Sequence, residues 1–121
     1  MARIGELERA VMEVLWSAGE PVAATDIVAA LSDRELAVTT VLTVLDRLGR
    51  KRLVTRERTG RAYRYTPTSS REALVAETML EALTGSDDRS AALNSFIESV
   101  SPEDAAVLRR ALSRQRRSKP E

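Results

Sequence analysis

The sequence lacks the two residue types that carry much of enzyme and metal chemistry. Its 121 residues include no cysteine and no histidine. Disulfides, thiol nucleophiles, imidazole acid–base catalysis and the commonest ligands of zinc and copper are therefore excluded. Catalysis would have to rest on carboxylates, Lys, Tyr, Ser or Thr, and no such constellation stands out. We expect a protein that is not an enzyme and needs no cofactor or metal.

Aromatic residues and long apolar runs are also scarce. The chain has four aromatic side chains, Trp16, Tyr63, Tyr65 and Phe96, so Leu, Val, Ile, Ala and Met must build its core. No stretch approaches the ~18 apolar residues of a membrane span. Charged residues interrupt the apolar positions near the N-terminus, unlike a signal peptide. We expect a cytoplasmic protein without membrane insertion, built as one domain or two very small ones.

Charge is balanced overall but unevenly distributed. The chain carries 19 Lys and Arg residues against 18 Asp and Glu residues. Between positions 47 and 64 the single acid is Glu57. The basic residues of that segment are Arg47, Arg50, Lys51, Arg52, Arg56, Arg58, Arg61 and Arg64. A cationic segment of this kind indicates a surface that binds a polyanion.

Hydrophobic periodicity predicts three helices in the first half of the chain. Ile4–Ser17 and Ala24–Leu31 place apolar side chains at helical spacing, and a brief extended segment, Val22–Ala23, precedes the second helix. The segment Val38–Lys51 is rich in β-branched residues, which favours a strand. Its apolar residues nevertheless recur at helical spacing, so we predict a third helix with one apolar and one polar face. The residues of the apolar face are Val38, Val41, Leu45 and Leu48.

Two short extended segments follow the third helix. Leu53–Thr59 and Ala62–Pro67 are separated by Gly60-Arg61, a turn typical of a β-hairpin. Tyr63 and Tyr65 would share one face of this hairpin, and we interpret both as structural. The order helix, helix, helix, hairpin is that of a winged helix-turn-helix, so residues 1–67 are predicted to form a winged-helix DNA-binding domain.

Residues 68–121 are predicted to form a second, helical domain. Ser69 and Glu72 match a capping box that opens its first helix. A second helix is expected at about Asp88–Ser99, and Ser101-Pro102 followed by two acids starts a third. The fold class is therefore mainly α with a small β-hairpin wing.

The polar face of the third helix and the hairpin carry the candidate DNA contacts. In a winged helix the third helix lies in the major groove, where threonine can meet base edges and arginine can contact guanine or phosphate. The predicted DNA-binding residues are Thr39, Thr40, Thr43, Arg47, Arg50, Lys51, Arg61 and Arg64. Arg61, at the hairpin tip, suits a narrow minor groove. A solvated helix face and an ordinary turn are the alternatives.

The C-terminal helices hold too little apolar material for an independent core of ~50 residues. Pairing with a second copy would complete this core, and a two-fold dimer matches a palindromic operator. The residues predicted to form the shared dimerisation core are Leu74, Val75, Met79, Leu83, Leu93, Phe96, Ile97, Leu108 and Leu112. An intramolecular bundle packed on the N-terminal domain is the alternative.

Three segments of the chain resemble the penicillinase repressors, the BlaI/MecI type of winged-helix regulator. The segments are Gly5–Met12 with Leu15-Trp16, Leu36–Leu48 and Ala62–Pro67. The middle segment is the most specific, because it covers a whole recognition helix and its approach. The resemblance implies a homodimeric transcriptional repressor on a palindromic promoter operator, with Thr40, Thr43 and Arg47 on recognition-helix positions.

The resemblance also implies a way of inducing the regulated genes, which would serve β-lactam resistance or cell-wall processes. In that family a membrane-bound sensor protease detects a β-lactam, and the repressor is then cut in its dimerisation helices at an Asn-Phe bond. In this chain Ser95 precedes Phe96 and Asn94 lies one place earlier, so the motif near Phe96 is displaced. The related copper-responsive repressors carry cysteine pairs, which this chain lacks.

Two other classes of function compete with a DNA-binding repressor. A winged-helix protein-interaction module would use the same basic surface against an acidic protein partner. An enzyme would require a pocket with converging carboxylates, of which the sequence shows no sign.

Overall fold

The computed structural model describes residues 4–118 of the chain. Contacts within the chain divide it into two compact units, the first reaching Glu81 and the second beginning at Ala82. The predicted boundary after Pro67 is a functional one, between DNA binding and dimerisation, and it stays a prediction.

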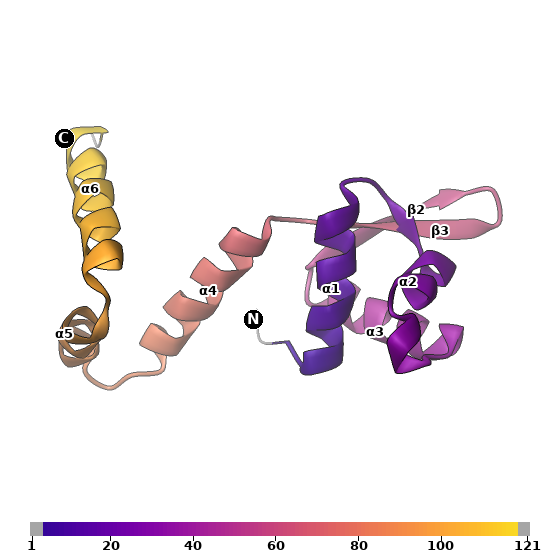
Figure 1. Ribbon diagram of the computed structural model, residues 1–121, viewed down its shortest axis with the longest axis horizontal. Helices are drawn as coiled ribbons and strands as arrows, with labels where there is room; N and C mark the ends of the chain where they lie inside the picture. The colour runs from indigo at the N-terminus through magenta and orange to yellow at the C-terminus, as the bar shows by residue number, and fades with distance from the viewer. Residues whose placement is uncertain (1–3, 119–121) are drawn as a thin grey trace. The chain divides into compact units, whose positions relative to one another are not determined.

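The first unit opens with three helices, α1, α2 and α3 (Figure 1). They span Glu6–Ala18, Ala24–Ala30 and Val38–Arg50, with a short 3-10 turn at Ser32–Arg34 before α3. All three predicted helices are therefore confirmed, and the differences at their ends are of the size that helix boundaries commonly show. Gly19 follows the last residue of α1 as its C-cap, and its φ of 70° lies in the left-handed region where glycine is favoured.

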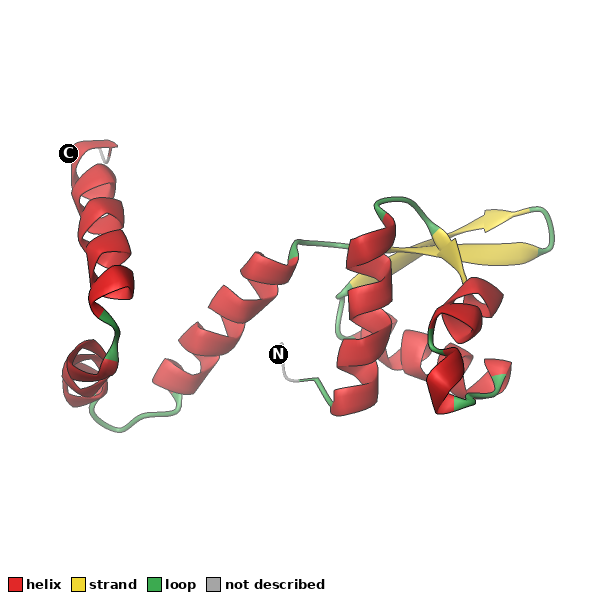
Figure 2. Ribbon diagram, in the orientation of Figure 1, coloured by secondary structure: helices red, strands yellow, loops and turns green. Residues whose placement is uncertain are grey.

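A three-stranded antiparallel sheet, in the order β1-β3-β2, completes the winged helix. The strands are β1 (Val22–Ala23), β2 (Val54–Thr59) and β3 (Ala62–Pro67). The predicted hairpin is confirmed, and it extends past α2 as a wing (Figures 1 and 2). The sequence predicted only an extended segment at β1. In the structure Val22 pairs with Tyr65 of β3, so β1 adds an edge strand to the hairpin.

The core of the first unit lies where the three helices meet the sheet. Its buried residues include Val11, Met12 and Leu15 of α1, Ile27 of α2, Val41, Val44, Leu45 and Leu48 of α3, and Leu53, Val54 and Tyr65. Val38 was expected on this buried face, but that expectation is wrong, because Val38 is 38% exposed and Val44 is 3% exposed. Around the helix, Val38 lies on one flank of Val41 and Val44 on the other, and the core covers the flank that carries Val44.

The start of α4 (Arg71–Thr84) belongs to the first unit and packs against its core. Leu74 is 3% exposed and belongs to the same core, and the indole Nε1 of Trp16 donates to the carbonyl oxygen of Ser69 at 2.9 Å. The cap predicted at Ser69 is wrong by one residue, since the hydroxyl of Ser70 accepts the N–H of Ala73 at 3.0 Å. Ser69 instead contacts the indole through its backbone carbonyl.

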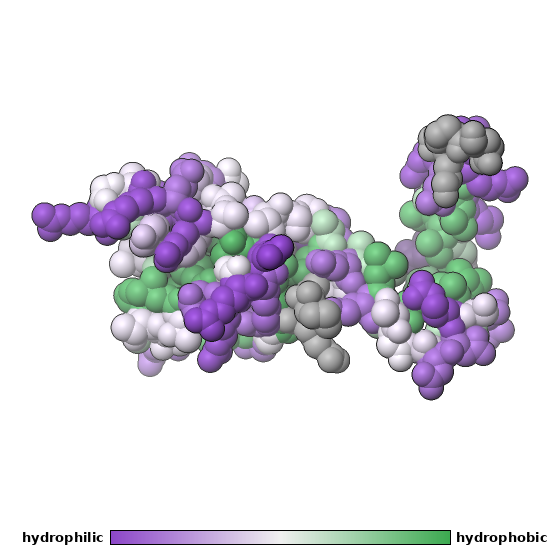
Figure 3. Space-filling view, turned by 180° about the vertical axis from the view of Figure 1, so that it is seen from behind, coloured by the Kyte–Doolittle hydropathy of each residue, from purple (hydrophilic) through white to green (hydrophobic). Residues whose placement is uncertain are grey.

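The second unit contains α5 (Arg89–Ser99) and α6 (Pro102–Ser118). The predicted starts are confirmed, because Asp88 accepts the N–H of Ala91 at 3.1 Å and Ser101 accepts the N–H of Asp104 at 3.0 Å. None of the described side chains of α5 and α6 is fully buried, and apolar groups reach the surface of these helices (Figure 3). None of the described helices has the length and apolarity that crossing a membrane requires.

Candidate nucleic-acid interface

The exposed face of α3 carries three threonines near its N-terminal end. Thr39, Thr40 and Thr43 are all exposed, because burial of the opposite face of α3 turns them outward. The hydroxyl of Thr43 donates to the carbonyl oxygen of Thr39 at 3.0 Å. Since this bond uses the hydroxyl hydrogen, the Thr43 oxygen can still accept a hydrogen bond, and its methyl group can make an apolar contact.

Two arginines extend this face toward the end of α3. Arg47 and Arg50 are exposed in the last turn, where the helix dipole favours a positive charge. Nη2 of Arg50 lies 3.2 Å from Oδ2 of Asp46, and the two side chains are 80% and 61% exposed. An ion pair this exposed contributes little free energy, so Arg50 can exchange Asp46 for a phosphate at small cost.

Lys51 is placed differently from the two arginines. Its Nζ lies 2.9 Å from Oε1 of Glu8 on α1, and the same oxygen accepts the N–H of Gly5 at 2.8 Å. Burial raises the pKa of Glu8, but the bonds from Lys51 and Gly5 and the charges of Lys51 and Arg47 outweigh burial, so the pKa lies below its ordinary value. Lys51 therefore joins the end of α3 to α1, a role that residue spacing did not indicate.

The tip of the wing presents an arginine to solvent. Thr59 lies opposite Ala62, which leaves Gly60 and Arg61 as a two-residue turn. Gly60 has a φ of 65°, which glycine adopts at no steric cost, and Arg61 is exposed. Arg64, also exposed, lies opposite Glu57 in the strand register.

Two further arginines of the wing were not among the predicted site residues. Arg56 and Arg58 lie directly opposite Tyr65 and Tyr63 in the register, and their guanidinium carbons stand 4.0 and 5.6 Å from the ring centroid of Tyr63. Tyr65 is 5% exposed, which confirms its structural role. The alternation of side chains along a strand would have placed both arginines on the tyrosine face.

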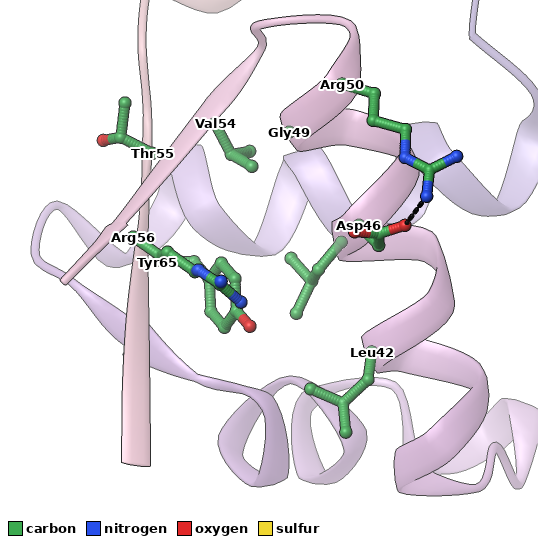
Figure 4. Close-up of a pocket in the computed structure, with 9 residues that line it drawn as sticks. Leu42, Asp46, Gly49, Arg50, Val54, Thr55, Arg56 and Tyr65 are labelled. Carbon is green, nitrogen blue, oxygen red and sulfur yellow. Dashed lines mark ion pairs between the residues drawn. The ribbon is translucent and has the colours of Figure 1, made fainter. Parts of the chain in front are cut away.

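A groove of about 640 Å³ runs between α3 and the sheet (Figure 4). Its walls carry two arginines, Arg50 from α3 and Arg56 from β2, and Tyr65 lies between the two elements. The remaining lining residues are Leu42, Leu45, Asp46, Gly49, Val54 and Thr55. Cations on both walls suit a strand of phosphates. Among the described residues, no three Asp or Glu side chains gather as a metal ion would require.

The residues predicted for dimerisation fall into three groups. Leu74 is buried in the core of the first unit. Leu83 and Leu108 are partly buried. The other side chains are 41% to 58% exposed, and they are Val75, Met79, Leu93, Phe96, Ile97 and Leu112.

Known proteins share both the sequence and the fold of this chain. The profile of the penicillinase repressor family matches residues 4–114. The transcriptional regulator BlaI of Mycobacterium tuberculosis, strains CDC 1551 / Oshkosh and H37Rv, is 49% identical over 117 residues, which cover 93% of this chain and 85% of that protein.

Two solved structures with bound DNA resemble the chain in fold alone. FabT of Streptococcus pneumoniae, in complex with DNA, superposes with a TM-score of 0.50 at 20% identity and covers 94% of this chain and 74% of its own. A MepR mutant of S. aureus, bound to an oligodeoxyribonucleotide, superposes with a TM-score of 0.52 at 19% identity. The match covers 95% of this chain and 79% of the MepR chain. With a family profile matched over residues 4–114 and a 49% identical relative, the chain belongs to the penicillinase repressor family of transcriptional regulators.

Proposed function

We propose that this repressor acts as a cytoplasmic homodimer that occupies a palindromic promoter operator. The observation that carries the proposal is the exposed face of α3, which presents threonines and arginines beside a wing with an arginine at its tip. A transcriptional regulator from a family of repressors needs such a surface and no catalytic centre.

The threonines and the arginines have different tasks in this proposal. Thr39, Thr40 and Thr43 meet base edges in the major groove, where hydroxyl and methyl groups distinguish base pairs. The phosphate contacts come from Arg47, Arg50, Arg61 and Arg64, with Arg61 at the minor groove. Lys51 contributes mainly by holding α3 on Glu8.

Dimerisation is proposed for residues 68–121. Pairing with a second copy would remove the exposed apolar side chains of the C-terminal helices from water. Each Å² of apolar surface buried in this way would stabilise the dimer by roughly 25 cal/mol. Leu74 already packs in the first unit, so the shared core would rest on the other predicted residues. A two-fold dimer then places two copies of α3 on the two half-sites.

We also propose that the regulated genes serve β-lactam resistance or the cell wall, and that a membrane sensor protease cuts the repressor near Phe96. Phe96 is 41% exposed and lies inside α5, so cleavage would require α5 to open locally. Mass spectrometry of the repressor after β-lactam exposure of the source cells would locate a cut. An intact chain in derepressed cells would contradict proteolytic induction.

The decisive experiment is a footprint of the purified protein on its own promoter region at two salt concentrations, with an unrelated duplex as competitor. We expect a symmetric, salt-sensitive footprint that resists the competitor. Arg61→Ala should weaken binding and flatten the plot of log affinity against log salt by ~0.9, the value for one phosphate contact. The matched control is Arg114→Ala, which removes an exposed arginine of α6 and should leave the slope unchanged.

An unchanged slope in Arg61→Ala would show that Arg61 makes no phosphate contact and would overturn the assignment of the wing tip. Weak binding that the unrelated duplex abolishes would leave only a general affinity for polyanions. That result would favour the protein-interaction module over the repressor.

A further inference from the structure

Two large apolar side chains stand on the exposed surface of α3. Leu42 is 42% exposed and Val38 is 38% exposed. They are four residues apart, so they lie on the same side of the helix, one turn above the other. Leu42 also lines the groove between α3 and the sheet (Figure 4).

The surroundings of Leu42 indicate what covers it. An isolated exposed leucine is common on protein surfaces and needs no explanation. Leu42, however, lies at the edge of the exposed face of α3, one turn from Thr39 and from Asp46, and the groove beside it carries Arg50 and Arg56. The net positive charge of this surface favours a polyanion over an apolar protein partner.

A duplex offers one apolar group in its major groove, the C5-methyl of thymine. We propose that Leu42, with Val38 beside it, reads thymine methyl groups in the operator. This inference rests on the proposed function, since α3 must enter the major groove for the contact to form. It adds an apolar readout to the hydroxyl readout of the three threonines.

The contact has a direct chemical test, because deoxyuridine differs from thymidine only by the C5-methyl group. Once the footprint has defined the operator, each thymine inside it is replaced singly by deoxyuridine. Burial of one methyl group is worth a factor of about three to five in affinity. For the wild-type protein we expect a loss of that size at one or two positions in each half-site, measured by fluorescence anisotropy.

Variants at Leu42 connect this loss to the side chain. Leu42→Asn has nearly the same size but is polar, so it should bind the thymine and deoxyuridine duplexes equally at those positions. Leu42→Met keeps the apolar surface and should keep the discrimination. Circular dichroism checks folding, which we expect to persist because Leu42 is 42% exposed. Deoxyuridine outside the footprint is the control within the DNA.

Each outcome either supports or overturns the inference. Discrimination that is present in wild type and Leu42→Met but absent in Leu42→Asn supports it. A footprint on which no deoxyuridine weakens binding, or on which Leu42→Asn discriminates as well as wild type, overturns the methyl contact and leaves the repressor intact. Absence of a symmetric footprint for wild type overturns the proposed function and the methyl contact together.

Discussion

Arg71, the first residue of α4, binds the carboxylate of Glu13 on α1 through two guanidinium nitrogens. Nη2 of Arg71 lies 2.6 Å from Oε1 of Glu13, and Nε lies 3.1 Å from Oε1 and 3.2 Å from Oε2. The guanidinium carbon also stands 5.3 Å from the ring centroid of Trp16. These contacts, with the bond from Trp16 to Ser69, fasten the beginning of α4 to α1.

The pair of Glu13 and Arg71 should show a measurable coupling free energy. Both side chains are at least 40% exposed, so a double-mutant cycle with Glu13→Ala and Arg71→Ala, measured by urea unfolding, should give a favourable but small coupling free energy. High salt should reduce this coupling by screening. Arg9, whose Nη1 is 3.9 Å from Glu13, is the control and should couple less. Zero coupling at low salt would show that other contacts, such as burial of Leu74 and the bond from Trp16 to Ser69, hold the start of α4.

Arg52 occupies a position that glycine usually takes. Its φ is 64°, the N–H of Leu53 donates to the carbonyl of Leu48 at 2.9 Å, and the N–H of Arg52 donates to the carbonyl of Gly49 at 3.0 Å. This is the Schellman pattern that ends a helix with a left-handed residue. Arg52→Gly should raise the free energy of unfolding by about 0.5 to 1 kcal/mol, because relief of the left-handed strain exceeds the added entropy of the unfolded chain.

Arg47→Gly is the matched control for that change. It removes the same charge from inside α3, where glycine costs about 1 kcal/mol, so its effect should have the opposite sign. Urea unfolding measures both variants. A loss of stability in Arg52→Gly would mean that the arginine side chain contributes more than the strain costs.

The pair of Glu8 and Lys51 should make stability depend on acid pH. The pKa of Glu8 is lowered in the folded protein, so its contribution is fully present above the ordinary glutamate value of about 4.3 and is lost as pH falls through the lower folded value. Glu8→Gln should lower the free energy of unfolding by about 1 to 3 kcal/mol at neutral pH. Unfolding curves of both proteins should converge as the pH falls below about 4.

Lys51→Met tests the same pair from the other side. It leaves the carboxylate of Glu8, which is 8% exposed, without its ammonium partner. The variant should therefore lose at least as much stability as Glu8→Gln at neutral pH. A difference between wild type and Glu8→Gln that stays constant from pH 7 to pH 3 would contradict the lowered pKa.

Leu74 and Met79 should affect different properties although both lie on α4. Leu74 is 3% exposed and belongs to the core of the first unit, so Leu74→Ala should lower the free energy of unfolding by about 2 to 4 kcal/mol. Met79 is 53% exposed, so Met79→Ala should weaken self-association with little loss of folding of the first unit. Sedimentation equilibrium and urea unfolding of both variants separate the two effects. Weaker association in Leu74→Ala alone would reverse the assignment.

The elements that the sequence predicted well are those encoded within a few neighbouring residues. Helical spacing predicted α1, α2 and α3, and Gly60 predicted the turn of the wing. Ser101 with Pro102 predicted the start of α6. Each of these signals involves residues that are close in the sequence, because backbone dihedral preferences and helix caps are local properties.

The sequence by itself determined the winged-helix order, the basic segment and the face of α3 that carries the threonines. The tertiary structure alone decided that Lys51 pairs with Glu8, that Leu74 joins the first core, and that β1 pairs with β3. It also decided that Val38 and Leu42 stay exposed. These contacts join residues far apart in the chain, and they depend on how preformed helices pack, which periodicity within any one helix does not encode.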